Sequence, residues 1–188
     1  MSMGLKRSRS LMKLYLLKSD HRYQGFVLEE DPKILDVLLR FDGTRIGKSW
    51  SPLRVEVDDD DPSQLPLADF PSLTISHIPC FSKFAVATLH DVLVQNGEVL
   101  PLSCDAGDYF AYNVTSIIDA LNIEASDIDY FPSGKFMDVK RYTLYPERVK
   151  GADIFKLPQA PLMGVFVTDR FVRLVEQNQL SGFLFKPL

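Results

Sequence analysis

The residue types best suited to catalysis or metal binding are few in this sequence: His21, His77, His90, Cys80 and Cys104. His77 and Cys80 form one short-spaced couple, whereas a zinc site usually takes its ligands as two such couples. No glycine-rich turn of the kind that presents a nucleophile flanks either cysteine. We therefore predict no catalytic residue, no metal site and no cofactor, and we expect the cysteines to be small buried apolar residues. A small hydrolase or transferase that uses Cys80 or Cys104 with a histidine stays the alternative.

Carboxylates are abundant, and their densest group is the run Asp58, Asp59, Asp60 and Asp61. A calcium-binding loop alternates its ligands around a central glycine and ends in glutamate, and four consecutive aspartates do not have that spacing. The run is either a solvated turn after a strand or an acidic surface for a protein partner. Trp50 is the only tryptophan, and tryptophan is common both in cores and at the centres of interfaces. For a protein interface we predict these four aspartates, with Trp50 as an aromatic anchor.

Charge is unevenly distributed along the chain. The formal net charge of the 188 residues is −4. Residues 55–134 alone carry −13, with Lys83 as their one basic residue, whereas residues 1–54 carry +5 and residues 135–188 carry +4. Nucleic-acid backbones are bound by clustered lysine and arginine, so the acidic middle argues against a nucleic-acid partner. It favours a basic protein partner, because complementary charge speeds encounter.

The first residues of the chain differ from the rest. Residues 1–11 are basic and contain no acidic residue, and no apolar stretch or cleavage site of a secretory signal follows them. We predict a loose basic leader over residues 1–11, or a natural start at Met12, and a single domain over residues 12–188. No run of about 20 apolar residues is present, so we expect no membrane partner. Two cysteines form no disulfide framework, and we expect a cytoplasmic protein.

Three segments have the signals of helices. The first begins with Asp31 as N-cap and stops at Gly43. The second runs from Ser82, also an N-cap, to Asn96, and the third begins after Thr168 as N-cap.

Short apolar or alternating runs between these helices predict strands. Pro101 cannot donate to a β-ladder, so its strand is expected at the edge of a sheet. The elements mix without regular alternation, which predicts an α+β fold with a mixed or antiparallel sheet and about three helices. The predicted strands are residues 14–17, 50–57, 73–78, 99–102, 109–114, 136–145, 154–157, 165–167 and 183–185.

Several segments, taken together in their order and spacing, resemble a known bacterial family. The similarity runs from about residue 12 to 186 and is strongest over residues 81–134. The segments are Met12-Lys13-Leu14-Tyr15-Leu16-Leu17, Phe81-Ser82-Lys83, Asn96-Gly97-Glu98-Val99-Leu100-Pro101-Leu102, Asp108-Tyr109-Phe110-Ala111-Tyr112-Asn113-Val114, Ile118-Asp119-Ala120-Leu121, Phe131-Pro132-Ser133-Gly134, Asp153-Ile154-Phe155, Val167-Thr168-Asp169, Leu174-Val175-Glu176 and Leu180-Ser181-Gly182-Phe183. They resemble one of the immunity proteins encoded beside toxins in bacterial polymorphic toxin systems, formerly a domain of unknown function.

The resemblance implies an intracellular protein, without enzymatic activity, that binds and blocks one cognate toxin. It supplies no catalytic residues to carry over. The acidic middle of the chain suits a basic toxin such as a nuclease. A structural adaptor of a secretion system is the other alternative.

Overall fold

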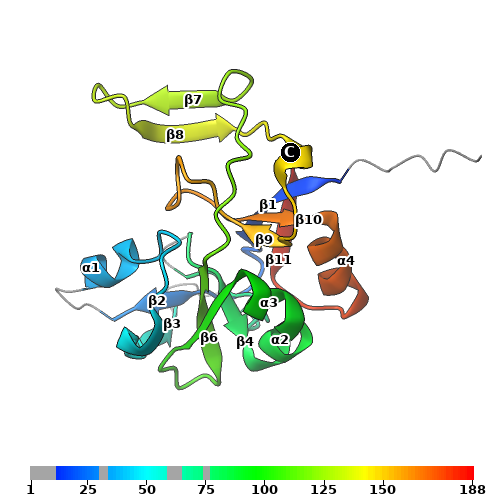
Figure 1. The fold of residues 1–188 in the computed structure, drawn as a ribbon. Coiled ribbons are helices and arrows are strands. Elements are labelled where there is room, and N and C mark those ends of the chain that lie inside the picture. Colours follow the sequence, from blue (N-terminus) through cyan, green and yellow to red (C-terminus); the bar gives the residue numbers. More distant parts are fainter. Residues whose placement is uncertain (1–11, 30–33, 59–64, 74–76) are drawn as a thin grey trace, which may run out of the picture.

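The computed structural model describes residues 12–29, 34–58, 65–73 and 77–188, which form a body of small sheets and helices with one extended hairpin (Figure 1). The predicted leader, the N-cap Asp31 and the aspartates Asp59, Asp60 and Asp61 lie outside the described residues. The helices are α1 (Ile34–Leu39), α2 (Lys83–Thr88), α3 (His90–Asn96) and α4 (Asp169–Gln177), with the short 3-10 helices η1 (Gly47–Ser49) and η2 (Pro146–Arg148). The strands are β1 (Leu14–Ser19), β2 (Phe26–Leu28), β3 (Val55–Val57), β4 (Cys80–Ser82), β5 (Gly97–Pro101), β6 (Tyr109–Val114), β7 (Asp127–Tyr130), β8 (Phe136–Arg141), β9 (Ile154–Phe155), β10 (Phe166–Thr168) and β11 (Phe183–Pro187).

The largest sheet joins the two ends of the described chain. Its strand order is β11-β1-β10-β9, and every neighbouring pair is antiparallel. β1 lies between two C-terminal strands, with Leu14 opposite Thr168 and Leu17 opposite Phe185. The strand predicted from the apolar run at residues 14–17 is confirmed, and its burial on both faces explains why that run is continuous rather than alternating.

Three smaller antiparallel sheets complete the strand pairing: β4-β6-β5, β2-β3 and the β7–β8 hairpin. β5 is an outer strand and ends at Pro101, as its missing N–H predicts. The β7–β8 hairpin extends away from the body (Figure 1). Its turn closes where the N–H of Gly134, a residue with φ of +79°, donates to the oxygen of Phe131 at 2.9 Å.

The helix signals are largely confirmed, with three corrections. The first helix, α1, ends at Leu39 rather than at the predicted stop Gly43. Ser82 caps α2, because its hydroxyl accepts from the N–H of Ala85 at 3.1 Å. The single helix predicted from Ser82 to Asn96 is interrupted at Leu89, which ends α2 and precedes α3. Thr168 precedes α4 but makes no side-chain cap; its hydroxyl donates to the Asp153 carboxylate at 2.9 Å instead.

Gly97 joins α3 to β5 for a steric reason. Its φ of −179° is ordinary extended backbone, open to any residue. A Cβ there, however, would lie 2.2 Å from the oxygen of Asn113 and 2.7 Å from the ring of Tyr112. A glycine is therefore needed because β6 passes directly against this position.

Several predicted strands are longer than the structure shows. The segment predicted over residues 50–57 is a strand only over β3, and β8 ends at Arg141 rather than at residue 145. The strand predicted at residues 73–78 has one bridge, at Leu73, and residues 74–76 lie outside the described part. β7 was not predicted, because Asp127–Tyr130 alternates charged with apolar residues over only four positions.

Three clusters of buried apolar side chains form the core. The first lies between the β11-β1-β10-β9 sheet, α4 and the α2–α3 pair; the second lies among α1, β2-β3 and β4-β6-β5. The third includes Leu14 and Leu16 from the opposite face of β1. In it the rings of Tyr142 and Phe166 pack edge-on, with 4.9 Å between their centroids and 73° between their planes. The α+β class with antiparallel sheets is confirmed. Among the described residues, no helix combines the length and apolar character required to cross a membrane.

Candidate protein-binding surfaces

The two cysteines have environments that suit packing better than catalysis. Cys80 on β4 is buried, and this burial, with the neighbouring Cys104, raises the pKa of its thiol. A raised pKa disfavours the thiolate, which is the nucleophilic form. Cys104 is half-buried against the second core cluster, which contains Cys80. Within the described ranges, no three or more His, Cys, Asp or Glu side chains come together as metal ligands.

Two basic residues, the half-buried His77 and the fully buried Lys156, influence each other through charge. Burial lowers the pKa of Lys156 to about 8, although the nearby Asp42 carboxylate opposes the change. The Lys156 ammonium donates to the backbone oxygen of Phe41 and so links the start of the 41–49 loop to the residue after β9. Burial, followed by the Lys156 charge, lowers the pKa of His77 to about 4, while a backbone hydrogen bond to Leu38 opposes it. The ring is therefore neutral at pH 7, and its Nε2 has no partner among the described residues.

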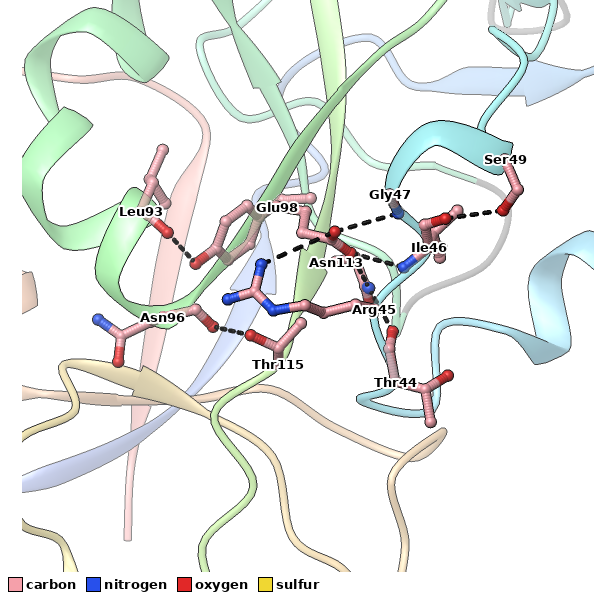
Figure 2. Close-up of polar contacts among 11 residues, drawn as sticks. Thr44, Arg45, Ile46, Gly47, Ser49, Leu93, Asn96, Glu98, Asn113 and Thr115 are labelled. Carbon is pink, nitrogen blue, oxygen red and sulfur yellow. Dashed lines mark hydrogen bonds and ion pairs between the residues drawn. The ribbon is translucent and has the colours of Figure 1, made fainter.

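A polar joint centred on Glu98 holds the 44–47 loop against β5 and β6 (Figure 2). The Glu98 carboxylate accepts from the backbone N–H groups of Ile46 at 2.8 Å and Gly47 at 3.1 Å, and from the Asn113 amide at 2.9 Å. The same amide donates to the oxygen of Thr44 at 2.7 Å, and the Arg45 guanidinium lies 3.8 Å from the carboxylate. Burial raises the pKa of Glu98, but these bonds and the Arg45 charge outweigh it and the pKa is lowered. We call Glu98, Asn113 and residues 44–47 the Glu98 joint.

A second set of bonds beside the Glu98 joint fixes the end of α3. The Tyr112 hydroxyl donates to the oxygen of Leu93 at 2.8 Å. The backbone oxygen of Asn96 accepts from the N–H of Thr115 at 2.9 Å, and the Asn96 amide donates to the oxygen of Val92 at 2.8 Å. Figure 2 shows Leu93, Asn96 and Thr115 on the side of β6 away from the loop. These polar groups bind one another, so their role is structural.

Many acids of the acidic middle are paired within the molecule. The Asp69 carboxylate accepts from the hydroxyls of Ser82 at 2.8 Å and Ser181 at 2.9 Å. Other acids form ion pairs, two of them with basic residues of the flanking segments. Such exposed pairs stabilise little, but they neutralise the acidic field locally. They are Arg54–Asp105, Lys83–Asp108 at 2.7 Å and Lys140–Asp129 at 2.7 Å.

The predicted interface residues Trp50 and Asp58 lie at the surface of the second core cluster. Trp50 is half-buried; its indole N–H donates to the oxygen of Pro101 at 2.9 Å, and its ring meets Phe41 edge-on at 5.8 Å. Asp58 directly follows β3, and its N–H donates to the oxygen of Gly25 at 3.0 Å. Trp50 thus packs against the core with its edge exposed. The role of Trp50, Asp58, Asp59, Asp60 and Asp61 in binding stays a prediction.

The β7–β8 hairpin is a surface that the sequence analysis did not identify. Three large apolar side chains on it are about half exposed: Tyr130 (46%), Phe131 (48%) and Met137 (47%). The rings of Tyr130 on β7 and Phe136 on β8 pack edge-on, with 5.3 Å between their centroids. Apolar side chains grouped on a projecting element are typical of a binding surface. The turn at residues 131–134 was the only sequence signal for a hairpin. No sequence pattern indicates that apolar side chains on such a hairpin are exposed.

Comparison with known families bears on the same part of the chain. Residues 102–188 match a family described as "Immunity protein family (Imm11)". No curated protein matches the chain. The matched range contains β6 to β11, α4 and the β7–β8 hairpin, whereas the similar segments before residue 102 lie outside it. The resemblance to an immunity protein family of polymorphic toxin systems is thus confirmed, and residues 102–188 carry it.

Proposed function

We propose that this protein binds and neutralises one cognate toxin of a bacterial polymorphic toxin system, inside the cell and without catalysis. The observation that carries the proposal is the match of residues 102–188 to an immunity protein family. Proteins of this kind act by occupying a surface of the toxin. The proposal therefore requires a stable scaffold with an exposed binding surface rather than a reactive centre.

The chemistry of the described residues supports binding over a Cys/His enzyme. A nucleophilic cysteine needs a lowered pKa and an adjacent base. Cys80 has a raised pKa, and the buried Nε2 of the half-buried His77 has no partner among the described residues. The carboxylates of Glu98 and Asp69 are occupied by hydrogen bonds within the chain.

The β7–β8 hairpin is the part of the matched range that we propose as a contact for the toxin. Its exposed residues Tyr130, Phe131 and Met137 offer apolar area on an element that extends away from the body in Figure 1. Tyrosine, phenylalanine and methionine are enriched in interfaces relative to other surfaces.

Co-expression with the toxin domain encoded by the neighbouring gene tests the function. We expect the wild-type protein to restore growth of cells that the toxin alone stops. The hairpin variant Tyr130→Ser/Phe131→Ser/Met137→Ser should lose much of this protection. The matched control Leu35→Ser/Phe84→Ser/Val94→Ser, which removes apolar side chains at least as exposed, should retain it. Continued toxicity with abundant, folded wild-type protein would contradict the proposed function, and equal protection by both variants would contradict only the hairpin contact.

A further inference from the structure

A groove lies at the root of the β7–β8 hairpin, where the chain after β8 passes the ends of β1 and β11. It consists of two adjoining hollows of about 650 and 510 Å³. Tyr142, Thr143, Pro187 and Leu188 line both hollows. These volumes are within the range of sites that bind ligands or side chains of a partner.

The groove combines an apolar floor with charges of one sign. Its floor includes Leu16 and Leu144. The side chains in its lining that are charged at neutral pH are all basic: Lys13, Lys140, Arg141 and Lys186. They come from the residue before β1, from β8 and from β11, that is, from three separate segments of the sequence.

Three of these cations have no carboxylate partner in the part of the chain that the structure describes. Lys140 pairs with Asp129 at 2.7 Å, but no ion pair among the described residues involves Lys13, Arg141 or Lys186. All three are exposed. The charged side chains that line the groove are thus basic in a protein whose net charge is −4, although the carboxylates of Asp127, Asp129 and Asp138 act on Lys140 from beside it.

Tyr142 adds a neutral donor to the same lining. Its ring is buried against Phe166, and burial, with the Asp138 charge, raises the pKa of Tyr142 to about 12. The phenol thus keeps its proton at physiological pH. Its hydroxyl makes no hydrogen bond within the part of the chain that the structure describes. A protonated hydroxyl is available to donate to a carboxylate.

We propose that this groove binds an acidic segment of the toxin, one that carries aspartate or glutamate beside apolar side chains. The inference rests on the proposed immunity function and names the chemistry of the partner. The apolar floor contacts the apolar side chains of the segment, and Lys13, Arg141 and Lys186 form ion pairs with its carboxylates. A basic segment is excluded by repulsion, and the apolar floor suits a protein better than a phosphate backbone.

Binding of the purified toxin domain from the neighbouring gene, measured by calorimetry at low and moderate salt, tests the inference. The groove variant Lys13→Glu/Arg141→Glu/Lys186→Glu should weaken binding at least about 30-fold, because each reversal places a carboxylate against the acidic segment. The control variant Lys18→Glu/Lys48→Glu/Lys150→Glu changes three exposed lysines and has the same net charge. It should change affinity less than about 3-fold, because exposed charges away from the contact are screened.

The outcomes separate the groove from the proposed function. Wild-type binding with a weakened groove variant and an unaffected control supports the inference. Equal binding by the wild type and both variants would overturn the proposed groove site and leave the immunity function intact. Equal weakening by both variants would mean that affinity depends only on net charge, which would also overturn the groove site. Self-association of the wild type that the groove variant abolishes would identify a second copy as the occupant and overturn it. Wild-type protein that neither binds nor protects removes the function and the groove together.

Discussion

The Glu98 joint and the groove at the root of the hairpin differ in what their charged groups contact. In the joint, one carboxylate accepts two backbone N–H groups and an amide, and Arg45 lies beside it. In the groove, Lys13, Arg141 and Lys186 face an apolar floor without a carboxylate partner among the described residues. A charge whose partners lie within the chain stabilises the fold, and one without such partners is available to another molecule.

The distinction between paired and unpaired charges also applies to the acidic middle of the chain, residues 55–134. Residues 55–134 carry −13 in the sequence, which predicted an acidic surface. In the structure, Asp105 and Asp129 pair with Arg54 and Lys140 from the basic flanks, and Glu98 and Asp69 hold loops in place. The basic side chains of the groove come from the flanks themselves. A sum of charge along the chain therefore does not show which charges are paired within the fold, and the binding role of Asp58, Asp59, Asp60 and Asp61 stays a prediction.

Removing the Glu98 carboxylate should give the largest effect on stability. We expect Glu98→Ala to lower the free energy of unfolding by about 3 kcal/mol, because the N–H groups of Ile46 and Gly47 lose their acceptor in a partly buried site. The measurement is urea unfolding at pH 7. Glu124→Ala, which removes an exposed glutamate, is the control and should change stability by less than about 0.5 kcal/mol.

Glu98→Gln extends this test to pH. The pKa of Glu98 is lowered in the folded protein, so its charge stabilises the fold above the unfolded pKa, and this stability is lost as pH falls through the folded pKa. The difference between wild type and Glu98→Gln should therefore be present at pH 7 and shrink below about pH 4.5. A difference that is constant down to pH 3 would mean that the charge of Glu98 contributes nothing.

Lys156 is the buried counterpart of the groove cations, and its effect should be somewhat smaller. Its folded pKa of about 8 lies below the ordinary lysine pKa of 10.5, so the unfolded chain binds more protons between these values and stability rises with pH there. Relative to Lys156→Met, the wild type should gain about 2 kcal/mol between pH 7 and pH 10. Thermal unfolding of both proteins across this range measures the gain, and Lys150→Met, at an exposed position, should show none.

Local sequence signals predicted most elements of the fold. The apolar run of β1, the Ser82 cap and Pro101 at a sheet edge each depend on neighbouring residues, and each is present in the structure. Strand ends were less predictable, because β8 ends at Arg141 although the apolar residues Tyr142 and Leu144 follow it. Tyr142 is buried in the third core cluster and Leu144 is half-buried against it, a tertiary packing that no local pattern reveals.

The hairpin surface and the groove depend on contacts between distant residues and were not predicted from the sequence. Lys13, Arg141 and Lys186 line one groove because β1 lies beside β11 and the residues after β8 line both of its hollows. Glu98 is 51 residues from Gly47, to which it binds. The family resemblance was predictable because it rests on residue order, whereas the location of unpaired charge rests on pairing in space.

The acidic run should have the smallest effect, and its salt dependence distinguishes it from the groove. Reversal of Asp58, Asp59, Asp60 and Asp61 to lysine should weaken toxin binding about 5-fold at low salt, because exposed acids act mainly on the association rate of a basic partner. The loss should vanish near 0.5 M salt, because exposed charges there interact over only a few ångströms. Binding by the groove variant should stay weakened at this salt concentration, because its charges lie within a desolvated contact. Stopped-flow association rates at both salt concentrations measure this, with Glu29→Lys/Glu124→Lys/Glu147→Lys/Glu176→Lys, at four exposed glutamates, as a charge-matched control. Unchanged rates at low salt would remove the acidic run from the interface, and a loss that persists at high salt would make it a direct contact equal to the groove.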